Sequence, residues 1–486
     1  MKELMIALQT AQDGTQGQQI PLYEQIYLAI RRDIEDGRLP RGEKLPSTRL
    51  LADNLNVSRF TVNLAYEQLV SEGYLQARAG SGFFVCDLSD LYDGLTREKS
   101  AEPVSDPPGA RAAVPEMVPR IDFSPFAVDA EHFPYHSWKR CSKDVLDHTD
   151  DLLLAREAEG DWQLRETVAT YLYRARGVNC TPEQILVGAG NEYLLMLIVQ
   201  LLGAGRTVVM DDPTYVQAYQ VLGHAGCRLL AGSSDRDGLL CDTSQMRQAD
   251  MAYVMPSHQF PMGTVMPLAR RQELLDWAAE RPGRYILEDD HDSEFRYVGK
   301  PIPSLQSRDR NDCVIYFGTF SKSISPALRM SYLVLPRHLG KRFHTQFGCY
   351  SSTVSTQQQL TVSRFMQNGD FERHLNRMRR IYKAKHDFLL RELKHRSWVE
   401  SIYGENAGLH LVVTVRTDLS EEQLLCSASD RGVRLYGMSN YRIHQEQNPD
   451  RQKVTFLLGF GGLSEEQILD GLQILDELLQ NNRICH

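Results

Sequence analysis

A lysine flanked by groups that can bind phosphate is the strongest chemical signal in the sequence. Lys322 follows Thr319 and Ser321 directly after an expected strand, and Arg329 stands seven residues further on. A lysine held in a partly desolvated site loses proton affinity and can form a Schiff base with an aldehyde cofactor. The neighbouring hydroxyls and the guanidinium are suited to gripping a phosphate dianion. An isolated lysine is usually a surface charge, but this combination indicates pyridoxal 5'-phosphate (PLP) as the cofactor.

A PLP site also needs a carboxylate against the pyridine nitrogen, because protonation there makes the ring an electron sink. We expect Asp289 in this role, since it closes the expected strand 284–288. His291, two residues further on, could face the phenolic oxygen of the ring. Glu288 and Asp290 are alternative carboxylates, and three consecutive acidic residues could equally form a metal site or a solvated strand end. We expect no metal, because no second acidic or histidine cluster is evident at a matching strand end.

Three other loops follow expected strands, at the carboxyl ends where α/β sheets place their ligands. A glycine-rich turn joins the first strand to a helix, so its free amides can receive phosphate. An aromatic ring in the second loop can stack on pyridine. The residues of these loops that we assign to cofactor binding are Gly190, Asn191, Glu192, Tyr215 and Gln259. Each motif is weak alone, and their convergence strengthens the prediction.

The elements that must position these residues predict an α/β fold with a mostly parallel sheet. Strand-like segments alternate with segments long enough to be helices. The expected strands are 184–188, 206–210, 252–255, 284–288, 313–317 and 331–335. After a charged helix at 372–395, strands at 409–415 and 453–460 with two helices predict a smaller α+β lobe. We place the large lobe at about 120–395 and the small lobe at about 396–486.

Residues 20–85 carry the pattern of three helices followed by a two-stranded hairpin. Apolar residues recur on one face of the first helix. Ser47 and Ser58 can cap the second and third helices, which only a few residues separate. Residues 74–85 predict a hairpin with a glycine-containing turn. The order of helix, helix, helix and wing favours a winged helix-turn-helix that binds DNA.

In a helix-turn-helix, polar side chains at the leading end of the recognition helix enter the major groove, while amides and basic residues hold the phosphates. Glycines let the tip of a wing approach a sugar-phosphate backbone closely. The residues that we assign to DNA contact are Lys44, Ser47, Arg49, Ser58, Arg59, Thr61, Asn63, Gly80, Ser81 and Gly82. A small helical domain that binds protein is the alternative, and the lack of an overall basic charge on this domain weakens the electrostatic argument for DNA.

Length and composition are those of a soluble globular protein of about three domains. The chain has 486 residues, 42% hydrophobic and 24% charged, and its formal net charge of -9 means that any DNA contact must be local. Nine cysteines without a Cys-x-x-Cys pair fit reduced thiols in the cytoplasm, and we expect no membrane-spanning segment. We divide the chain into a DNA-binding domain at 1–87, a linker at 88–119 and a PLP-binding domain at 120–486.

Three motifs of the N-terminal domain resemble those of the GntR-type winged helix. They are Leu45-Pro46-Ser47-Thr48-Arg49, Val57-Ser58-Arg59-Phe60-Thr61-Val62, and Glu72-Gly73-Tyr74-Leu75 with the following Gly80-Ser81-Gly82-Phe83. The resemblance spans about 65 residues. It implies that operator DNA is contacted by Arg49, Ser58, Arg59, Thr61 and the wing from Gly80 to Gly82.

The whole chain resembles the MocR/GabR regulators, in which a GntR winged helix is fused to a fold-type I aminotransferase-like domain. The resemblance implies that Lys322 forms the Schiff base with PLP, that Asp289 pairs with the pyridine nitrogen and that Tyr215 stacks on the ring. It also implies a homodimer that binds operator DNA. The residues that it assigns to phosphate binding are Gly190, Asn191, Glu192, Thr319, Ser321 and Arg329.

Three departures from the family pattern concern the ligand. His291 stands where tyrosine is common, and its imidazole can still hydrogen-bond the phenolic oxygen. In residues 455–460, leucine replaces the arginine with which aminotransferases clamp the substrate carboxylate, and Gln217 replaces a second arginine of the GABA-sensing branch. The loss of such charge-assisted contacts costs roughly a few kcal/mol. A simple amino acid is therefore a poorer candidate for the effector.

These observations favour a PLP-dependent transcriptional regulator. The resemblance makes its aminotransferase-like domain the effector sensor and dimerisation unit, with PLP or a small amino compound as the signal. A working aminotransferase with an appended DNA-binding domain is the alternative, since the lysine and the aspartate allow that chemistry. A protein-binding scaffold with a vestigial site agrees least with the sequence, because the lysine and the phosphate-binding groups are intact.

Overall fold

The chain divides into two compact units, Met1–Glu116 and Met117–His486, each of which is described by itself. The computed structural model describes residues 6, 20–87, 119–148, 157–299, 302–444 and 452–480. Residues 88–118, which make up nearly all of the expected linker, lie outside the described residues. A winged helix followed by an α/β unit confirms the predicted fold class.

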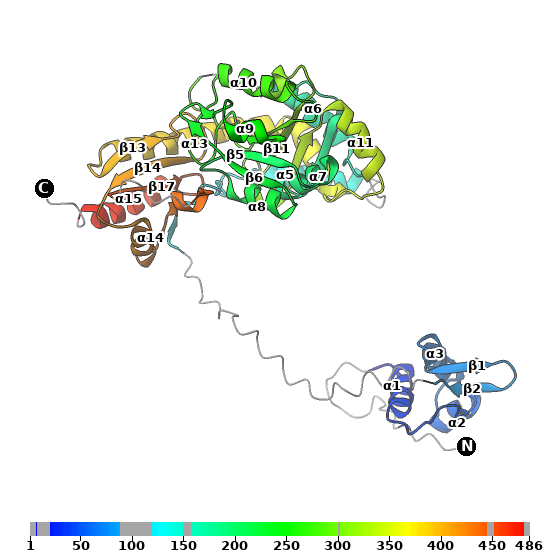
Figure 1. Cartoon of the computed structure of the whole chain (residues 1–486). Helices are drawn as coiled ribbons and strands as arrows, with labels where there is room; N and C mark the ends of the chain where they lie inside the picture. Colours follow the sequence, from blue (N-terminus) through cyan, green and yellow to red (C-terminus); the bar gives the residue numbers. More distant parts are fainter. Residues whose placement is uncertain are drawn as a thin grey trace. The chain divides into compact units, whose positions relative to one another are not determined.

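The N-terminal unit consists of three helices and a hairpin (Figure 1). Its elements are α1 (Leu22–Glu35), α2 (Thr48–Leu55), α3 (Arg59–Ser71), β1 (Leu75–Arg78) and β2 (Gly82–Val85), and the two strands are antiparallel. The side chains with no exposed surface at the centre of its core are Ile26, Ile30, Leu51, Val62, Ala65, Tyr66 and Leu69. Burial of each large apolar side chain contributes about 1.5–3 kcal/mol, so this core holds the helices together.

Local capping interactions determine where α2 and α3 begin. The hydroxyl of Ser47 accepts a hydrogen bond from the amide of Leu50 at 3.2 Å, and the hydroxyl of Ser58 accepts one from the amide of Thr61 at 3.1 Å. Asn56 ends α2 in the left-handed conformation, with φ of 54°. The short left-handed turn and the Ser58 cap therefore fix the start of the recognition helix.

The larger unit is built on a seven-stranded sheet with the strand order β4-β12-β11-β10-β9-β5-β6. All neighbouring strands are parallel except β12, which is antiparallel to both β11 and β4. The strands are β4 (Ile185–Gly188), β5 (Thr207–Asp211), β6 (Arg228–Gly232), β9 (Met251–Val254), β10 (Tyr285–Asp290), β11 (Val314–Thr319) and β12 (Ser331–Val334). The sheet is thus mostly parallel, as the sequence predicts.

The side chains of this sheet alternate between its two faces, and those of opposite faces pack in separate apolar clusters. Ile315 and Phe317 pack in one core with α7 (Asn191–Leu202), α8 (Val216–His224) and α11 (Arg337–Phe347). Val314 and Tyr316 face the opposite side. The helices on that side are α6 (Trp162–Arg176), α9 (Ser244–Gln248), α10 (Leu268–Ala279) and α12 (Thr356–Gln367). Helices therefore cover both faces, which requires the strands to be apolar on both sides.

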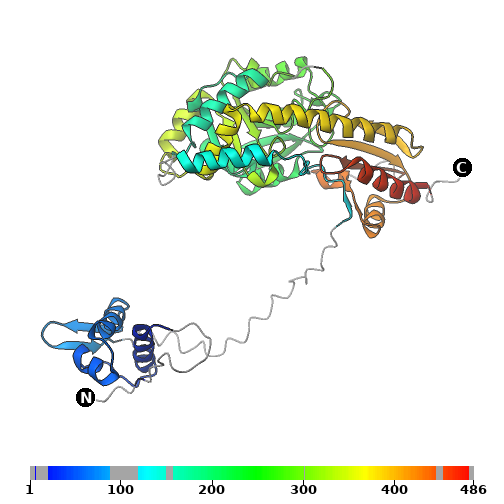
Figure 2. The ribbon, with the colours of Figure 1, turned by 180° about the vertical axis from the view of Figure 1, so that it is seen from behind.

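A smaller antiparallel sheet has the order β13-β14-β17-β16. Its strands are β13 (Val399–Tyr403), β14 (His410–Arg416), β16 (Tyr436–Gly437) and β17 (Lys453–Gly459). The neighbouring helices are α13 (Asp370–Lys394), α14 (Glu421–Asp430) and α15 (Glu465–Gln480). Figure 2 shows α13 running along the unit from the larger sheet towards the smaller one.

The first strand of the larger unit joins the smaller lobe. β3 (Ile121–Asp122) pairs in parallel with β15 (Val433–Arg434), and the amide of Gly459 donates to the carbonyl of Phe123 at 2.9 Å. The remaining elements are α5 (Tyr135–His148), the short hairpin of β7 (Ser234–Asp235) and β8 (Gly238–Leu239), and 3-10 turns at Pro182–Gln184, Gln306–Arg308, Pro326–Leu328 and Met438–Tyr441. Among the described residues, no helix combines the length and the apolar character needed to cross a bilayer.

The register of β12 brings the ends of two other strands together. Ser331, the first residue of β12, lies opposite Thr319 at the end of β11 and opposite Gly188 at the end of β4. The loops that follow β4 and β11 therefore start side by side at the carboxyl edge of the sheet, although they are far apart in the sequence.

Candidate functional site

A cavity of about 250 Å³ lies at this carboxyl edge. Ten of the residues that the sequence assigns to the cofactor line it: Gly190, Asn191, Glu192, Tyr215, Asp289, His291, Thr319, Ser321, Lys322 and Arg329. Gln259 is not among the lining residues. Its side chain donates to the carbonyl of Pro213 at 2.9 Å and accepts from the amide of Met262 at 3.0 Å, so it braces two loops beside the cavity.

Lys322 is buried beside a carboxylate that sequence reasoning missed. Its Nζ lies 3.5 Å from Oδ2 of Asp292, which also contacts Nδ1 of His258 at 2.9 Å and Nε2 of His291 at 3.3 Å. Burial alone would raise the pKa of Asp292, but the charges of His258, His291 and Lys322 outweigh it and hold this pKa well below its usual value. Asp292 is therefore ionised and holds the lysine in place.

His258, His291 and Asp292 also form a possible metal-binding group, since their ligand atoms lie within 4.8 Å of one another. His258 follows β9, so the folded chain adds one histidine from a neighbouring strand end to the acidic segment, where the sequence indicated no second cluster. The ammonium of Lys322, 3.5 Å from the same carboxylate, opposes a metal cation at this position.

Asp289 faces the cavity from β10 and is oriented by two side chains. The hydroxyl of Tyr253 donates to Oδ2 of Asp289, and Nδ2 of Asn191 lies 3.3 Å from Oδ1. Burial raises the pKa of Asp289, while His291, Tyr253 and Asn191 oppose the increase. A cationic N–H group in the cavity could pair with this poorly solvated carboxylate. Neither Tyr253 nor the amide of Asn191 was assigned this role from the sequence.

The other end of the cavity offers several donors to an anion. Helix α7 begins after Gly190 without a side-chain cap, so its first amides are free. Hydroxyls of Thr319, Ser321 and Ser331 are linked by hydrogen bonds of 2.9 and 3.0 Å. Nη2 of Arg329 reaches Oε2 of Glu192 at 2.6 Å. Ser331 was not predicted, although its position at the start of an expected strand gave a signal.

Gly190 is required where the backbone passes the Arg329 guanidinium. Its φ is 95°, a conformation that side chains disfavour. A Cβ atom at this position would lie 2.5 Å from Nη2 of Arg329 and 2.9 Å from Oε2 of Glu192. Any larger residue would therefore push the guanidinium away from the turn.

Aromatic rings form part of the lining of the cavity. Tyr215, which precedes α8, meets Phe260 edge to face with ring centres 5.9 Å apart. Phe126 lies 5.4 Å from Phe260 and 6.3 Å from Tyr215. All three line the cavity, so a planar ring could stack there. The sequence indicated Tyr215 alone, because Phe126 and Phe260 come from other segments.

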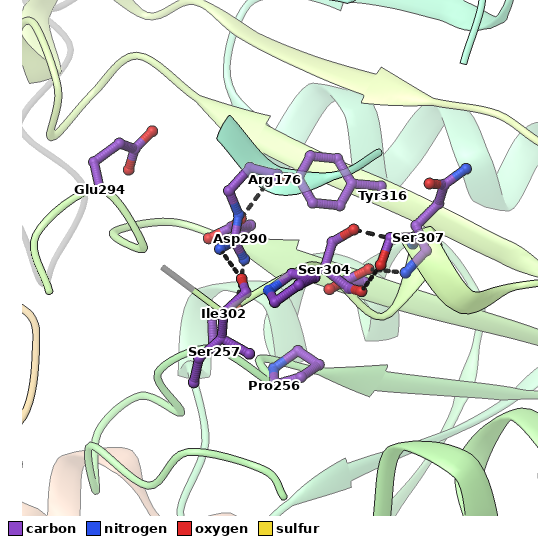
Figure 3. Close-up of polar contacts among 12 residues, drawn as sticks. Arg176, Pro256, Ser257, Asp290, Glu294, Ile302, Ser304, Ser307 and Tyr316 are labelled. Carbon is purple, nitrogen blue, oxygen red and sulfur yellow. Dashed lines mark hydrogen bonds and ion pairs between the residues drawn. The ribbon is translucent and has the colours of Figure 1, made fainter. Parts of the chain in front are cut away.

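The two other acidic residues of β10 face away from the cavity. Glu288 accepts hydrogen bonds from the amides of Leu305 at 2.6 Å and Gln306 at 2.8 Å. Asp290 forms a buried ion pair in which Nε of Arg176 lies 2.6 Å from Oδ2 (Figure 3). Because side chains alternate along a strand, Asp289 alone of the three meets the cavity.

Arg176 ties three elements together behind the cavity (Figure 3). It closes α6 and donates to the hydroxyl of Ser257 at 2.6 Å and to the carbonyl of Ile302, while the hydroxyl of Tyr316 donates to the same oxygen of Asp290 at 2.6 Å. This network fixes the end of β10 against the loop that follows β9. It therefore positions Asp289 and His258 without touching the cavity.

The predicted DNA-contacting residues gather at the starts of α2 and α3 and at the wing. Arg49 and Arg59 are exposed in the first turns of α2 and α3. Lys44 extends beside the wing, with Nζ 5.9 Å from the ring centre of Phe84. Gly80 and Gly82 have φ of 71° and 107°, which the turn between β1 and β2 requires.

The remaining predicted DNA-contacting residues differ in how accessible their side chains are. The hydroxyls of Ser58 and Thr61 are hydrogen-bonded to each other at 2.7 Å, so both are partly engaged within the helix. The Ser47 hydroxyl caps α2 in the same way. Asn63 is half-buried, and Ser81 is exposed at the tip of the wing.

Comparison with known families agrees with both units. The family described as "Bacterial regulatory proteins, gntR family" matches residues 22–85, and "Aminotransferase class I and II" matches residues 125–449. The chain is 38% identical to the uncharacterized HTH-type transcriptional regulator YdeL of Bacillus subtilis, over 94% of this chain and 96% of that protein. It is 33% identical to the probable rhizopine catabolism regulatory protein MocR of Rhizobium meliloti, over 94% and 93%.

The chain belongs to the MocR/GabR type of HTH-type transcriptional regulators. A further relative is the HTH-type pyridoxine biosynthesis transcriptional regulator PdxR of Corynebacterium glutamicum, 30% identical over 85% of this chain and 87% of that protein. Among solved structures, the multiple substrate aminotransferase from Thermococcus profundus covers 81% of this MocR-type chain and 95% of its own, with a TM-score of 0.65 and 23% identity. This likeness shows that the two share a fold.

We predict that Arg176→Met strongly destabilises the larger unit. The substitution would leave Asp290 buried without a cation, which typically costs roughly 3–5 kcal/mol. Urea unfolding of the full chain should show the loss, and Arg174→Met, an exposed arginine on the same helix, is the matched control. An equal, small effect of both substitutions would contradict a central role for the buried pair.

We also predict that acid weakens the fold through His410. This histidine is fully buried, its Nε2 lies 2.8 Å from the carbonyl of Pro261, and burial lowers its pKa to about 3. Its ordinary pKa is about 6.5, so the neutral form stabilises the fold fully above that pH. This contribution falls by up to roughly 1.4 kcal/mol per pH unit as the pH drops from about 6.5 towards 3.

The measurement is the melting temperature of wild type and His410→Gln across this pH range. The variant should lose less stability between pH 7 and pH 5, because it no longer carries the group that must take up a proton. His374, whose pKa burial also lowers, remains in both proteins and cancels in the comparison. Parallel curves for the two proteins would refute the role of His410.

Proposed function

We propose that this MocR-type regulator binds operator DNA through its winged helix and holds PLP in the cavity of the larger unit. In this proposal the protein acts as a homodimer, PLP is the effector, and each copy reads one half of the operator. The observation that carries the cofactor proposal is one cavity lined by Lys322, Asp289 and the free N-terminus of α7.

The side chains in the cavity suit each part of PLP. Asp289 would accept a hydrogen bond from the protonated ring nitrogen, and His291 lies beside it for the phenolic oxygen. The free amides of α7 and the hydroxyls of Thr319 and Ser321 would hold the phosphate. Oδ1 of Asn191 is buried and has no hydrogen-bond partner among the described residues, so it is available to a ligand.

When bound, PLP supplies an aldehyde that a primary amine can capture and a ring that withdraws electrons. Lys322 presents that amine, and the ionised Asp292 beside it keeps the amine positioned. Tyr215 and Phe260 would exclude water from one side of the ring. These residues bind and orient the cofactor and need no substrate to do so.

The lining of the cavity disfavours a simple amino acid as the effector. Of the described residues that line it, Arg329 is the single arginine, and its guanidinium is already paired with Glu192. Leu457 is fully buried in an apolar core, and Gln217 lines the cavity without a charge. The missing guanidinium also speaks against turnover by an aminotransferase. The relative PdxR is named as a regulator of pyridoxine biosynthesis, which supports PLP as the signal.

Operator selection with and without PLP tests both parts of the proposal. The full-length protein would be mixed with random duplexes at physiological salt, because affinity depends strongly on salt. One sequence family should be enriched, and its affinity should change when PLP is added. Failure to retain any specific duplex would refute the regulator proposal, whereas retention that ignores PLP would refute PLP as the effector.

We predict that Lys322→Ala abolishes covalent capture of PLP. Borohydride treatment followed by mass spectrometry should find the cofactor fixed to the wild type and absent from the variant. Lys341→Ala, an exposed lysine on α11, is the control and should behave like wild type. If the Lys322→Ala protein still gained operator affinity on addition of PLP, sensing through the covalent bond would be excluded.

We predict that Arg49→Ala weakens operator binding without changing which sequence is preferred. Arg49 is exposed at the start of α2 and is positioned to contact a phosphate. Loss of one phosphate contact should reduce the slope of log affinity against log salt by about one. Arg32→Ala, which removes the same charge from α1, should leave the slope unchanged. An unaltered slope for Arg49→Ala would argue against this contact.

A further inference from the structure

Phe60 is a large aromatic side chain that the winged helix leaves in solvent. It stands in the first turn of α3 and is 73% exposed, more than any other large hydrophobic residue described in the chain. It is not among the hydrophobic residues that pack on the core of this unit. Its exposed ring therefore contributes little to folding stability and is accessible to a partner.

The position of Phe60 on the helix is opposite the core. The buried residues of α3 are Val62, Ala65, Tyr66 and Leu69, which form one face at helical spacing. With 3.6 residues per turn, Phe60 lies on the side of the helix opposite the buried face. Asn63 lies nearly one turn further along the helix, close to the same side. Residues three apart are neighbours on a helix surface, so the ring and the amide lie next to each other.

The other side chains at the leading end of α3 are less available. The hydroxyls of Ser58 and Thr61 are bonded to each other, and the Ser58 hydroxyl also caps the helix. Within residues 20–87, by contrast, the side chain of Asn63 has no hydrogen-bond partner. Phe60 is thus an exposed apolar group, and Asn63 is a half-buried amide without a hydrogen-bond partner among residues 20–87.

We propose that Phe60 and Asn63 together read an A·T base pair in the major groove. In this arrangement the Phe60 ring packs against the thymine methyl group, while the Asn63 amide bonds to N6 and N7 of adenine. The thymine methyl and the donor–acceptor pair of adenine are both displayed in the major groove, and these are the partners that phenylalanine and asparagine suit. The inference rests on the proposed binding of operator DNA, to which it adds a base preference.

The test uses the full-length protein and the operator obtained by selection. Each thymine of the half-site is replaced in turn by deoxyuridine, which removes only the C5 methyl group, and affinity is measured by fluorescence anisotropy at fixed salt. Wild type should lose affinity about fourfold at one or two positions, the loss expected for one buried methyl-sized group. The Phe60→Ala protein should bind the normal operator about fourfold more weakly and should no longer respond to deoxyuridine at those positions.

Two further variants sharpen the comparison. Asn63→Ala should lose about tenfold in affinity and accept other bases where the adenine stands. Leu28→Ala removes another partly exposed hydrophobic side chain, 40% exposed on α1, and should retain wild-type affinity and wild-type sensitivity to deoxyuridine. All variants should melt at the wild-type temperature, because the removed groups lie outside the core.

The possible outcomes separate this inference from the proposed function. If Phe60→Ala binds as tightly as wild type, or loses the same affinity for the thymine and deoxyuridine operators, the reading of the methyl group is wrong while DNA binding stands. A contact of Phe60 with a protein partner would give the first of these results. If wild type binds no operator at all, the proposed function and this inference fail together.

Discussion

The buried ion pair between Arg176 and Asp290 is the interaction on which the site in the larger unit depends. Strand β10 carries three carboxylates in a row into the protein interior, where unpaired charge is strongly disfavoured. Glu288 accepts hydrogen bonds from backbone amides, and Asp289 accepts them from Tyr253 and Asn191. Asp290 forms an ion pair with Arg176 and accepts a hydrogen bond from Tyr316. Because Glu288 and Asp290 are bound on one side of the sheet, Asp289 between them faces the cavity on the other side.

The sequence predicted those parts of the site that follow a general rule. Lys322, Asp289 and Gly190 each come after a recognisable strand, and the carboxyl ends of parallel strands share one edge. Asp292 and His258 were missed because their contact joins two loops, 34 positions apart, whose packing only the folded chain determines. Phe126 was missed for the same reason. Gln259 was predicted to bind the cofactor, and its amide bonds to backbone groups of two loops beside the cavity, which the sequence does not reveal.

The winged helix was more predictable than the cofactor site because its determinants are local. Ser47 and Ser58 cap helices within three residues of themselves, and the glycines at 80 and 82 mark the turn of the wing. What local patterns did not reveal is which side chains remain exposed. Phe60 reads as an ordinary apolar residue in the sequence, and only the orientation of α3 against its core places the ring in solvent.

The pairing of β3 with β15 holds the first strand of the larger unit, and the cavity lining begins only a few residues after it. Ile121 is held to the smaller lobe by this pairing, and Phe126, five positions later, lines the cavity. A ligand that contacts the Phe126 ring therefore contacts a segment that begins at this strand pairing. The chain towards the winged helix continues from Ile121, so only five positions of sequence separate the cavity lining from the start of that connection.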